Sequence, residues 1–467
     1  QGRSIVYAQG KTLGGSSAIN GMIYNRGQAA DFDGWAQAGN SGWSYDEVLP
    51  YFKRTENRIG ESVDPDYRGV DGRFTVTTPK WPNELESAFY DAAINAGYPR
   101  NDDYNGASQD GVGAYQSSMS NGWRVSSASA FLKPARRKHK VDVRSNALAT
   151  AIMLVGKRAN GVSYRRGGNE SVVLAKREVI VCAGTLNSPK LLQLSGIGPA
   201  KLLKEHGVEV VHDLPSVGEN LRDHFSPRIV ARAKPGLKSI NQNATGLPLV
   251  GEVFRWLLKR PSVLAISPGR VHIFGKSSPE LESPDYVLLF APASYKAGMV
   301  GVLDDYPGFT VGTWQMRPQS TGYVRIGSAD PTVNANFNPR YLSDPLDSTI
   351  LLSAMKAGRN LLKTEPLASL VEEEVLPGTQ YKSDDELMGF AKQYGATSFH
   401  LVGSCRMGQH SDGSNVVDPR LRVHGVQALR VIDASVMPTI PSANTAASTM
   451  MIAEKGADMV IEDARKN

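Results

Sequence analysis

Two side chains in the C-terminal third of the chain are of types that can take part in acid–base chemistry. His400 follows Phe399, and Asn444 stands just after a proline-rich stretch. Histidine has an ordinary pKa that suits a base near neutral pH, and an amide can donate a hydrogen bond to a developing oxyanion. Taken alone, each also has a structural explanation. A histidine beside an aromatic residue is commonly part of a core, and an asparagine before a helix is commonly an N-cap.

A glycine-rich segment at the start of the chain is the first candidate for cofactor binding. It runs Gly-Lys-Thr-Leu-Gly-Gly-Ser-Ser-Ala-Ile-Asn-Gly-Met from Gly10 to Met22. Glycines at this density let backbone N–H groups approach a phosphate or a flat ring closely. A plain surface turn is the alternative. Leu13, Ile19, Met22 and Ile23 are apolar, however, so we expect the segment to be packed and to form a cofactor loop.

A strand-to-helix unit in the middle of the chain is a second candidate. Glu178–Cys182 reads as a strand, Ala183–Thr185 as a tight turn and Asn187–Leu194 as a helix with a proline near its start. Open α/β sheets present ligands at such a turn. Read alone, the unit is mainly structural. Gly196 and Gly198 follow a helix rather than a strand, and the third glycine of a dinucleotide-binding fingerprint is missing, so we reject them as such a fingerprint.

The elements that must position these residues can be read from caps and apolar periodicity. Ser44 and Glu47 form a capping box that predicts a helix over Tyr45–Arg54. Further helices are predicted over Asn83–Ala96, Pro345–Leu362 (with Asp344 as its cap) and Ala446–Glu462. Further strands are predicted at Val141–Val143, Ala149–Val155, Ser163–Tyr164, Asp285–Phe290, Phe309–Met316 and Ala428–Ile432. The rest of Ser226–Thr313 reads as irregular.

Composition indicates a large globular protein with more than one domain. The chain has 467 residues, of which 41% are hydrophobic and 21% charged, so it can bury sizeable hydrophobic cores. A chain of this length is too long for a single core, so we expect two domains. Polar insertions separate the α/β segments. We therefore predict a discontinuous domain formed by residues 1–30, 135–225 and 395–467, with a second domain formed by residues 31–134 and 226–394.

Charge, cysteines and apolar runs restrict the partners. The net charge of +6 is small for this length. The basic run Arg136–Lys140 has no interleaved aromatic residues, so a solvated turn is expected rather than a nucleic-acid surface. Cys182 and Cys405 read as buried free thiols in a reducing compartment, and no metal motif is present. The apolar run Val253–Leu258 is short, and no run reaches the ~18 residues of a membrane span.

Taken together, these segments resemble the signatures of the glucose–methanol–choline (GMC) FAD-dependent oxidoreductases. One signature matches Gly10–Asp33 and the other matches Gly184–Gly198. The resemblance continues through Gly122–Ser126, Val217–His224 and Ser328–Pro331 and on to the His400 and Asn444 segments, so it covers essentially the whole chain. It is strongest to hydroxymethylfurfural-oxidase-type and aryl-alcohol oxidases, with choline-dehydrogenase-like members close behind.

The resemblance implies an α/β plus α+β fold. A discontinuous Rossmann-like domain would bind FAD, and an inserted antiparallel-sheet domain would bind substrate. His400 matches the family's active-site base, and Asn444 matches its partner. Asp433 and Ala434 would hold the ribityl and diphosphate end, and the backbone of Val143 would meet the adenine. The full set of matched cofactor positions is Leu13, Gly14, Gly15, Ser16, Asn20, Gly21, Met22, Ile23, Val143, Phe399, Asp433, Ala434, Asn444 and Thr445.

Two departures from the family pattern matter. Some members bond FAD covalently through a histidine in the first signature, where this chain has Ile19, so we expect non-covalent FAD. The family's opening strand with its Gly-x-Gly-x-x-Gly turn has no counterpart in the sequence. Without it we expect a gap in the central sheet and the loss of the main phosphate site. Three explanations are open: Gln1 is not the natural start of the chain, the opening strand and its turn are supplied separately, or this polypeptide binds FAD weakly.

The implied activity is oxidation of a small primary alcohol to its aldehyde. The alcohol would be an aryl or furan alcohol such as 5-hydroxymethylfurfural, or choline-like. A base takes the proton and flavin N5 takes the hydride, with oxygen as the acceptor that yields hydrogen peroxide. A quinone-dependent dehydrogenase, a hydroxynitrile lyase on the same scaffold and a non-catalytic fragment without FAD are the alternatives. The sequence contains no GxSxG elbow and no HExxH motif, so we do not expect hydrolase or zinc chemistry. We expect a bacterial, cytoplasmic location.

Overall fold

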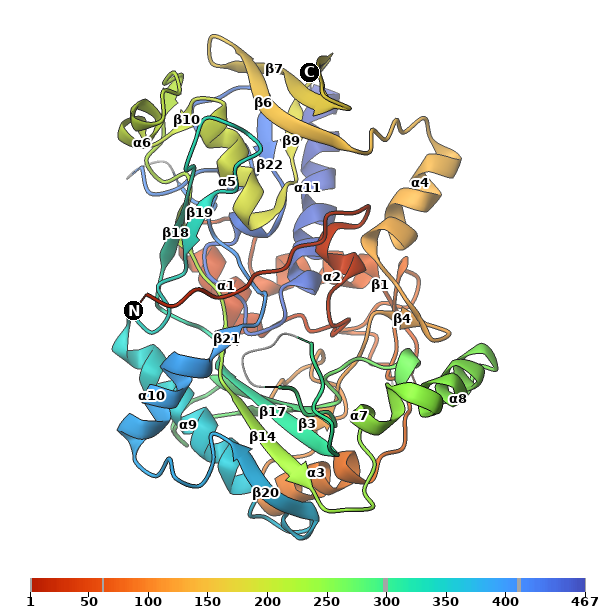
Figure 1. Ribbon diagram of the computed structural model, residues 1–467. Coiled ribbons are helices and arrows are strands. Elements are labelled where there is room, and N and C mark those ends of the chain that lie inside the picture. Colours follow the sequence, from red (N-terminus) through yellow and green to blue (C-terminus); the bar gives the residue numbers. More distant parts are fainter. Residues whose placement is uncertain (1, 61–62, 297–300, 410–412, 467) are drawn as a thin grey trace.

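A six-stranded antiparallel sheet forms the lower half of the molecule in Figure 1. The computed structural model describes residues 2–60, 63–296, 301–409 and 413–466. The strand order of the sheet is β20 (Val371–Leu376), β14 (Arg228–Ala233), β17 (Gly308–Gln315), β16 (Tyr286–Ala291), β15 (Val271–Gly275) and β3 (Gly111–Ala114). Every neighbouring pair is antiparallel. α3 (Glu84–Asn95) and α9 (Pro345–Leu361) pack with the sheet in one hydrophobic cluster, and their apolar stripes cover it.

A short parallel pair of strands lies in the upper half. β9 (Val179–Val181) pairs in parallel with β22 (Leu429–Val431), and the two strands run into α5 (Gly184–Leu194) and the turn before α11 (Ala446–Lys466). A three-stranded antiparallel meander, β6 (Ala147–Val155), β7 (Arg158–Arg166) and β8 (Asn169–Leu174), lies above them. The chain thus combines α/β units with an antiparallel sheet, as its sequence predicts.

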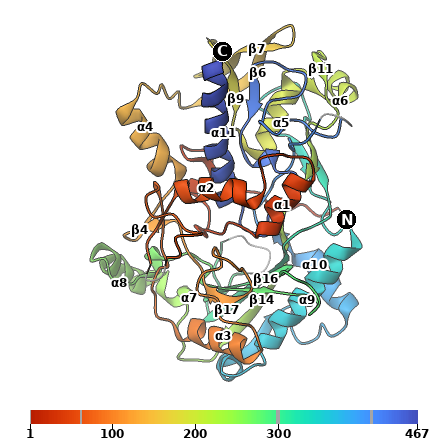
Figure 2. The same ribbon diagram turned by 180° about the vertical axis from the view of Figure 1, so that it is seen from behind.

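The largest hydrophobic cluster joins distant parts of the chain. Aromatic residues of α1 (Ala29–Gln37) and α2 (Tyr45–Thr55) pack with residues of α11, and Arg54 of α2 forms ion pairs with Glu454 and Asp458 of α11. Figure 2 shows α2 lying across α11. This packing connects the segment after residue 30 with the C-terminal helix. The two-domain division stays a prediction.

The remaining elements are short. They are η1 (Gly15–Ala18), β1 (Glu56–Arg58), β2 (Phe74–Val76), β4 (Met119–Ser120), β5 (Trp123–Arg124), η2 (Ala128–Leu132), α4 (Lys133–Lys138), β10 (Ile197–Gly198), α6 (Ala200–Glu205), β11 (His212–Asp213), β12 (Glu219–Leu221), β13 (Phe225–Ser226), α7 (Ile240–Asn243), α8 (Gly246–Leu257), η3 (Val263–Ala265), β18 (Gly322–Arg325), β19 (Asn336–Asn338), η4 (Leu367–Leu370), α10 (Asp384–Tyr394), β21 (Ala396–Thr397) and η5 (Ala434–Val436).

Most predicted elements are confirmed, and five expectations are wrong. Most of the basic run expected as a solvated turn lies in helix α4, and Leu13 and Ile19, expected to be packed, are 47% and 52% exposed. The capping box at Ser44 is present, and the five predicted helices begin and end within a few residues of the expected bounds. Residues 141–143 form coil with Val141 exposed, because no described strand pairs with them. The stretch expected to be irregular contains α8, and Cys182 is exposed rather than buried. None of the described helices is both long and apolar enough to span a bilayer.

Candidate active site

Two buried histidines and an asparagine form a hydrogen-bonded chain between the two halves of the molecule. His400 Nδ1 lies 2.9 Å from His224 Nδ1, and His400 Nε2 lies 2.9 Å from Asn444 Nδ2. His224 Nε2 lies 2.8 Å from the backbone carbonyl oxygen of Met316. Asn444 is supplied by the turn before α11, and Met316 follows β17, so the sheet and the C-terminal helix together fix the chain of contacts.

This chain of contacts fixes where the protons lie. A carbonyl oxygen can only accept, so His224 Nε2 must carry a hydrogen and donate it to Met316. Neutral His224 then has a bare Nδ1, which accepts a hydrogen bond from Nδ1–H of His400. His400 Nε2 is consequently unprotonated and accepts from the amide of Asn444. The geometry therefore presents His400 as a neutral base with its free nitrogen at the Asn444 end.

Burial keeps both rings neutral. His400 is 8% exposed and His224 is fully buried. Burial, reinforced by the charge that His224 would carry, lowers the pKa of His400 well below its ordinary value. Burial lowers the pKa of His224 to about 4. Near pH 7 both rings are uncharged, so His400 can take up a proton at Nε2, while its one N–H, at Nδ1, donates to His224.

Asp223 fixes the backbone that carries His400. Its carboxylate accepts from the His400 backbone N–H at 2.8 Å, from Thr397 Oγ1 at 2.6 Å, from Tyr7 at 3.0 Å and from Tyr341. Four donors saturate a carboxylate. Asp223 is therefore a positioning residue with no acceptor capacity left for a ligand.

The turn at Phe399 aims the base. Phe399 has a φ of +62°, a left-handed conformation that is uncommon for a bulky residue. Its N–H donates to Thr397 Oγ1 at 2.7 Å. The turn leaves the Phe399 ring 40% exposed while the next side chain points inward beside Trp314, whose ring centroid is 6.1 Å from that of His400. Such local strain, held by surrounding contacts, is typical of functional sites.

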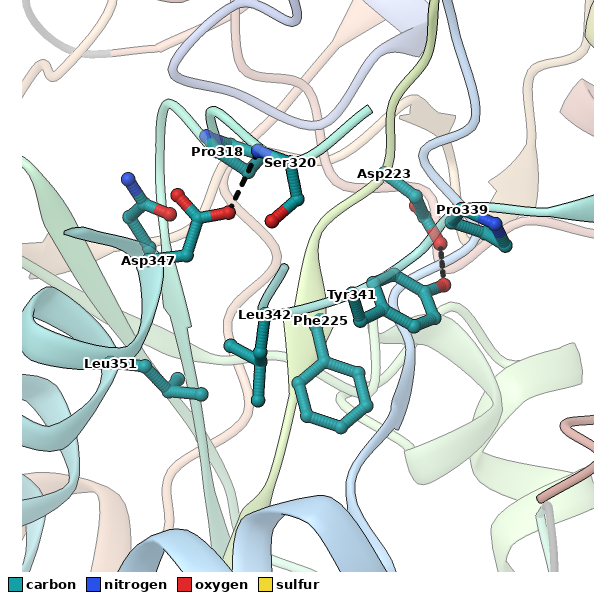
Figure 3. A pocket seen from close by; sticks show the side chains of 10 residues that line it. Asp223, Phe225, Pro318, Ser320, Pro339, Tyr341, Leu342, Asp347 and Leu351 are labelled. Atoms are coloured by element: carbon teal, nitrogen blue, oxygen red, sulfur yellow. Dashed lines mark hydrogen bonds between the residues drawn. The ribbon is translucent and has the colours of Figure 1, made fainter. Parts of the chain in front are cut away.

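A small pocket lies on the far side of Asp223 and cannot hold the substrate. Figure 3 shows the Tyr341 ring and Phe225 beside Asp223, with the Asp347 carboxylate accepting from the backbone of Ser320. The pocket holds about 20 Å³, room for roughly one water molecule. An alcohol must therefore approach His400 from the Asn444 side.

The first glycine-rich segment forms a compact loop. A side chain at Gly10 would meet the carbonyl oxygen of Gly15 at 2.1 Å, and Gly14 and Gly15 adopt φ values of +94° and +54°. Ser16 Oγ accepts from the N–H of Gly10 at 3.3 Å. Glycine is therefore required by the close approach at Gly10 and by the left-handed backbone at Gly14.

The end of this loop reaches the active-site wall. Met22 has a φ of +62°, and Ile23 packs in the same buried cluster as Trp314. Asn20 Oδ1 accepts from Arg124 at 2.7 Å and from the N–H of Met22 at 3.1 Å. Arg124 thus places a cation beside the loop. The neighbouring Gly21 is exposed, with its carbonyl bound by a serine hydroxyl.

Asp433 ties the second candidate segment to the site. Its carboxylate accepts from the N–H of Gly184, from Ser188 and from both the N–H and the hydroxyl of Ser435. Because these four donors saturate the carboxylate, a cofactor could meet only the backbone of Asp433 and Ala434. The carbonyl oxygen of Ala434 accepts from Gly403 in the His400 segment.

The structure groups most, but not all, of the predicted positions. Phe399, His400 and Asn444 lie together, and Thr445 directly precedes α11. Asp433 accepts from the N–H of Gly184, and Ala434 accepts from Gly403 in the His400 segment, so both contact the predicted site segments. Val143 lies in the coil between α4 and β6, away from these contacts. The sequence reasoning assigned no role to His224, Asp223 or Trp314, although Val217–His224 was part of the resemblance.

The site has the features that FAD requires. Leu13, Ile19 and Phe399 expose 47%, 52% and 40% of their surface, so apolar side chains next to the glycine turns are available to cover a flat ring. Asn444 Oδ1 is buried without a partner and can accept from a donor bound in front of His400. The residues present therefore fit FAD: the glycine-rich loop and the backbone at Asp433 and Ala434 would hold it, and it would supply the acceptor for a hydride.

Comparison with known proteins agrees with this geometry. The family models of the GMC oxidoreductases match residues 1–226 and 318–453. The chain is 37% identical over 462 residues to an oxygen-dependent choline dehydrogenase of Staphylococcus saprophyticus, covering 98% of this chain and 82% of the relative. It is 38% identical over 465 residues to an alcohol dehydrogenase [acceptor] of Pseudomonas putida, covering 98% and 83%.

Solved structures give the same result. Pyridoxine 4-oxidase from Mesorbium loti superposes with a TM-score of 0.88 at 28% identity, over 99% of this chain and 86% of that one. A formate oxidase from Aspergillus oryzae RIB40, studied for FAD modification, superposes with a TM-score of 0.88 at 27% identity, over 98% and 85%. The fold and site define an FAD-dependent oxidoreductase that acts on CH–OH groups. The chain belongs to the GMC oxidoreductase family.

Proposed function

We propose that this enzyme oxidises a neutral primary alcohol with a flat apolar substituent, such as an aryl or furan alcohol, to the aldehyde. The observation that carries the proposal is the ordered chain from Met316 through His224 to His400, which leaves His400 Nε2 without a hydrogen and in contact, among the described residues, only with the exchangeable amide donor of Asn444. The names of the relatives support alcohol oxidation as the reaction class.

In the proposed mechanism the protein handles the hydroxyl proton. The alcohol displaces the Asn444–His400 hydrogen bond: its hydroxyl donates to His400 Nε2 while the Asn444 amide donates to its oxygen, and the hydroxyl proton passes to Nε2 as the C–H bond is broken. The resulting imidazolium keeps its Nδ1–H bond to His224, and the Asn444 N–H donates to the developing alkoxide. FAD, when bound, supplies the acceptor for the hydride that leaves the carbon.

The surroundings of His400 favour a neutral substrate. The aromatic ring of Trp314 lies beside the His400 ring, and it suits a flat aromatic group. Asp223, its nearest carboxylate contact, is saturated by four donors. Choline is the second candidate, because several relatives are choline dehydrogenases and an indole face can hold a quaternary ammonium.

Oxygen is the proposed electron acceptor, and a quinone is the alternative. The relatives' names include an oxygen-dependent dehydrogenase, an oxidase and an acceptor-dependent dehydrogenase. Because those curated relatives are bacterial, a cytoplasmic bacterial location belongs to the proposal. So does non-covalent FAD, because Ile19 offers only an aliphatic side chain where a covalent link would need a nucleophile.

The test is to follow turnover of benzyl alcohol, 5-hydroxymethylfurfural and choline with either oxygen or a soluble quinone. The proposal predicts aldehyde and one equivalent of hydrogen peroxide from the aromatic alcohols in oxygen. Turnover of choline alone would overturn the substrate class, and turnover with quinone but not oxygen would overturn the acceptor.

Acid precipitation should release yellow FAD into the supernatant. Flavin that stays in the pellet would contradict non-covalent binding.

A further inference from the structure

Helix α8 (Gly246–Leu257) projects from the body of the protein with an apolar side facing solvent. Both ribbon views show it at the periphery, to the right in Figure 1 and to the left in Figure 2. Its inner side is fixed to the protein by Glu252, which accepts from the N–H of Val263 at 2.9 Å, and by Trp256, which donates to the carbonyl of Gly122 at 3.0 Å. The helix is therefore an ordered part of the fold.

The outer side of α8 carries large apolar residues at helical spacing. Leu247, Phe254 and Leu258 expose 87%, 62% and 65% of their surface, and Val250 and Leu257 are also exposed. At about 100° per residue these positions lie on one face. Single exposed apolar residues are ordinary, but a continuous apolar ridge on a soluble surface marks a contact site.

An exposed indole lies beside the inner side of α8. Trp123 of β5 is 62% exposed, and its ring centroid is 4.3 Å from that of Trp256. The next residue, Arg124, donates to Asn20 of the first glycine-rich segment. The ridge is thus connected by one β-strand to the predicted cofactor loop. We refer to Trp123 and the exposed apolar side of α8 as the α8 surface.

Basic residues border the α8 surface. Arg255 is 61% exposed at its side chain, and the exposed residues Lys259 and Arg260 follow the C-terminal end of the helix. The acidic residue within the helix, Glu252, is buried on the inner side. The Arg255 guanidinium lies 3.8 Å from the Glu252 carboxylate, which offsets part of its charge, and Lys259 and Arg260 add positive charge at the end of the helix.

A second basic cluster lies on the same side of the molecule. Helix α4 ends in Arg136, Arg137 and Lys138, and Lys140 follows, all of them exposed. Both ribbon views place α4 and α8 at the same side. The basic run Arg136–Lys140 thus lies on the side of the molecule from which the apolar ridge projects.

We propose that the α8 surface docks on an anionic phospholipid bilayer. A helix that lies in the interface buries its apolar face ~5–10 Å deep, while basic residues attract anionic headgroups and indoles lie at the headgroup level. All three features are present. A projecting convex ridge fits fluid lipid without a matching groove, whereas a protein partner would need one. No described helix can span the bilayer, so the contact is peripheral.

The experiment is sedimentation of the purified FAD-loaded protein with vesicles of equimolar phosphatidylglycerol and phosphatidylcholine, and with phosphatidylcholine alone. Binding to the mixed vesicles is expected, with tryptophan emission shifted to the blue. It should weaken as salt rises above ~0.15 M, where the Debye length is about 8 Å. The combined variant Leu247→Ser, Phe254→Ser and Leu257→Ser should bind at least about tenfold more weakly, because its apolar ridge is lost.

Two further variants test the parts separately. Arg136→Glu with Arg137→Glu should reduce binding to the mixed vesicles toward that seen with phosphatidylcholine alone. The matched control is Val155→Ser with Leu174→Ser, which removes apolar groups exposed by 67% and 70% on the distant meander. It should bind as the wild type does. Thermal midpoints and flavin spectra verify that each variant is folded.

Three outcomes would overturn the proposal. The first is no binding of the wild type to either vesicle. The second is equal binding by the α8 variant and the meander control. The third is a dimer in light scattering that disappears in the α8 variant while vesicle binding is absent, which would make the surface a contact between two copies. None of these outcomes depends on the substrate, so the proposed function is tested separately.

Discussion

Replacing His224 with leucine should slow reduction of the flavin by alcohol while leaving substrate binding nearly unchanged. His224 touches no substrate in this account. It acts through His400, whose Nδ1–H it accepts at 2.9 Å, and it thereby keeps His400 Nε2 unprotonated. Leucine accepts no hydrogen bond, so the Nδ1–H would be left buried without a partner.

The size of the effect follows from that lost bond. A buried donor left unsatisfied costs about 1–3 kcal/mol, and each 1.36 kcal/mol corresponds to a tenfold change. In the wild type, His224 favours the His400 tautomer with its hydrogen on Nδ1. Without that acceptor, the tautomer with its hydrogen on Nε2 becomes more populated, and it cannot accept the substrate proton. The rate constant for reduction should therefore fall by roughly 5- to 150-fold.

Anaerobic stopped-flow mixing with a series of alcohol concentrations separates the limiting reduction rate from the apparent dissociation constant. The matched variant is His224→Asn, because its amide oxygen can still accept from His400 Nδ1–H. It should recover most of the rate that the leucine variant loses. A leucine variant that reduces within twofold of wild type, or an asparagine variant as slow as leucine, would refute the reasoning.

Three further predictions concern charge and hydrogen bonding elsewhere. Asn444→Ala removes the donor beside His400 Nε2 and should slow flavin reduction by roughly 10²-fold in the same assay; an unchanged rate would remove Asn444 from the mechanism. Burial lowers the pKa of His272 to about 3, so the unfolded chain binds the extra proton between pH 6.5 and 3. The stability of the folded protein is then complete above pH 6.5 and falls by up to about 1.4 kcal/mol per pH unit below it. His272→Phe should therefore gain stability relative to wild type between pH 7 and pH 5 in denaturant unfolding, and a difference independent of pH would contradict this. Glu56 forms buried ion pairs with Arg26 and Arg68, so Glu56→Gln should lower the free energy of unfolding by about 3–5 kcal/mol; a loss below 1 kcal/mol would mean that the arginines find other partners.

Local rules were sufficient for the helices that carry strong end signals. The capping box at Ser44 and the Asp344–Pro345 start each specify a helix from a few adjacent residues, and both helices begin where predicted. Strand pairing is not local. Val141–Val143 has the composition of a strand, but no described strand lies beside it. Helix α8 was missed because glycine and proline near its start obscure its periodicity, and its apolar face points to solvent rather than to a core.

The active site was predictable only in part. His400 and Asn444 could be picked out because their residue types and surrounding motifs suggest acid–base chemistry, and the structure places them 2.9 Å apart. His224 could not be assigned a role, because its role depends on a contact with a residue 176 positions further along the chain. Trp314 lies inside a strand whose other residues are ordinary core, so only the folded sheet places it at the site.

The most direct test of the central claim is the visible spectrum of the FAD-loaded protein before and after anaerobic addition of benzyl alcohol, for wild type and His400→Ala. The account predicts that the flavin bands of the wild type bleach, while the variant retains its FAD spectrum and does not bleach. Bleaching of the variant at the wild-type rate would show that His400 is not the base. A wild type that binds FAD but is reduced by no alcohol would contradict the proposed oxidation and favour a lyase on the same scaffold.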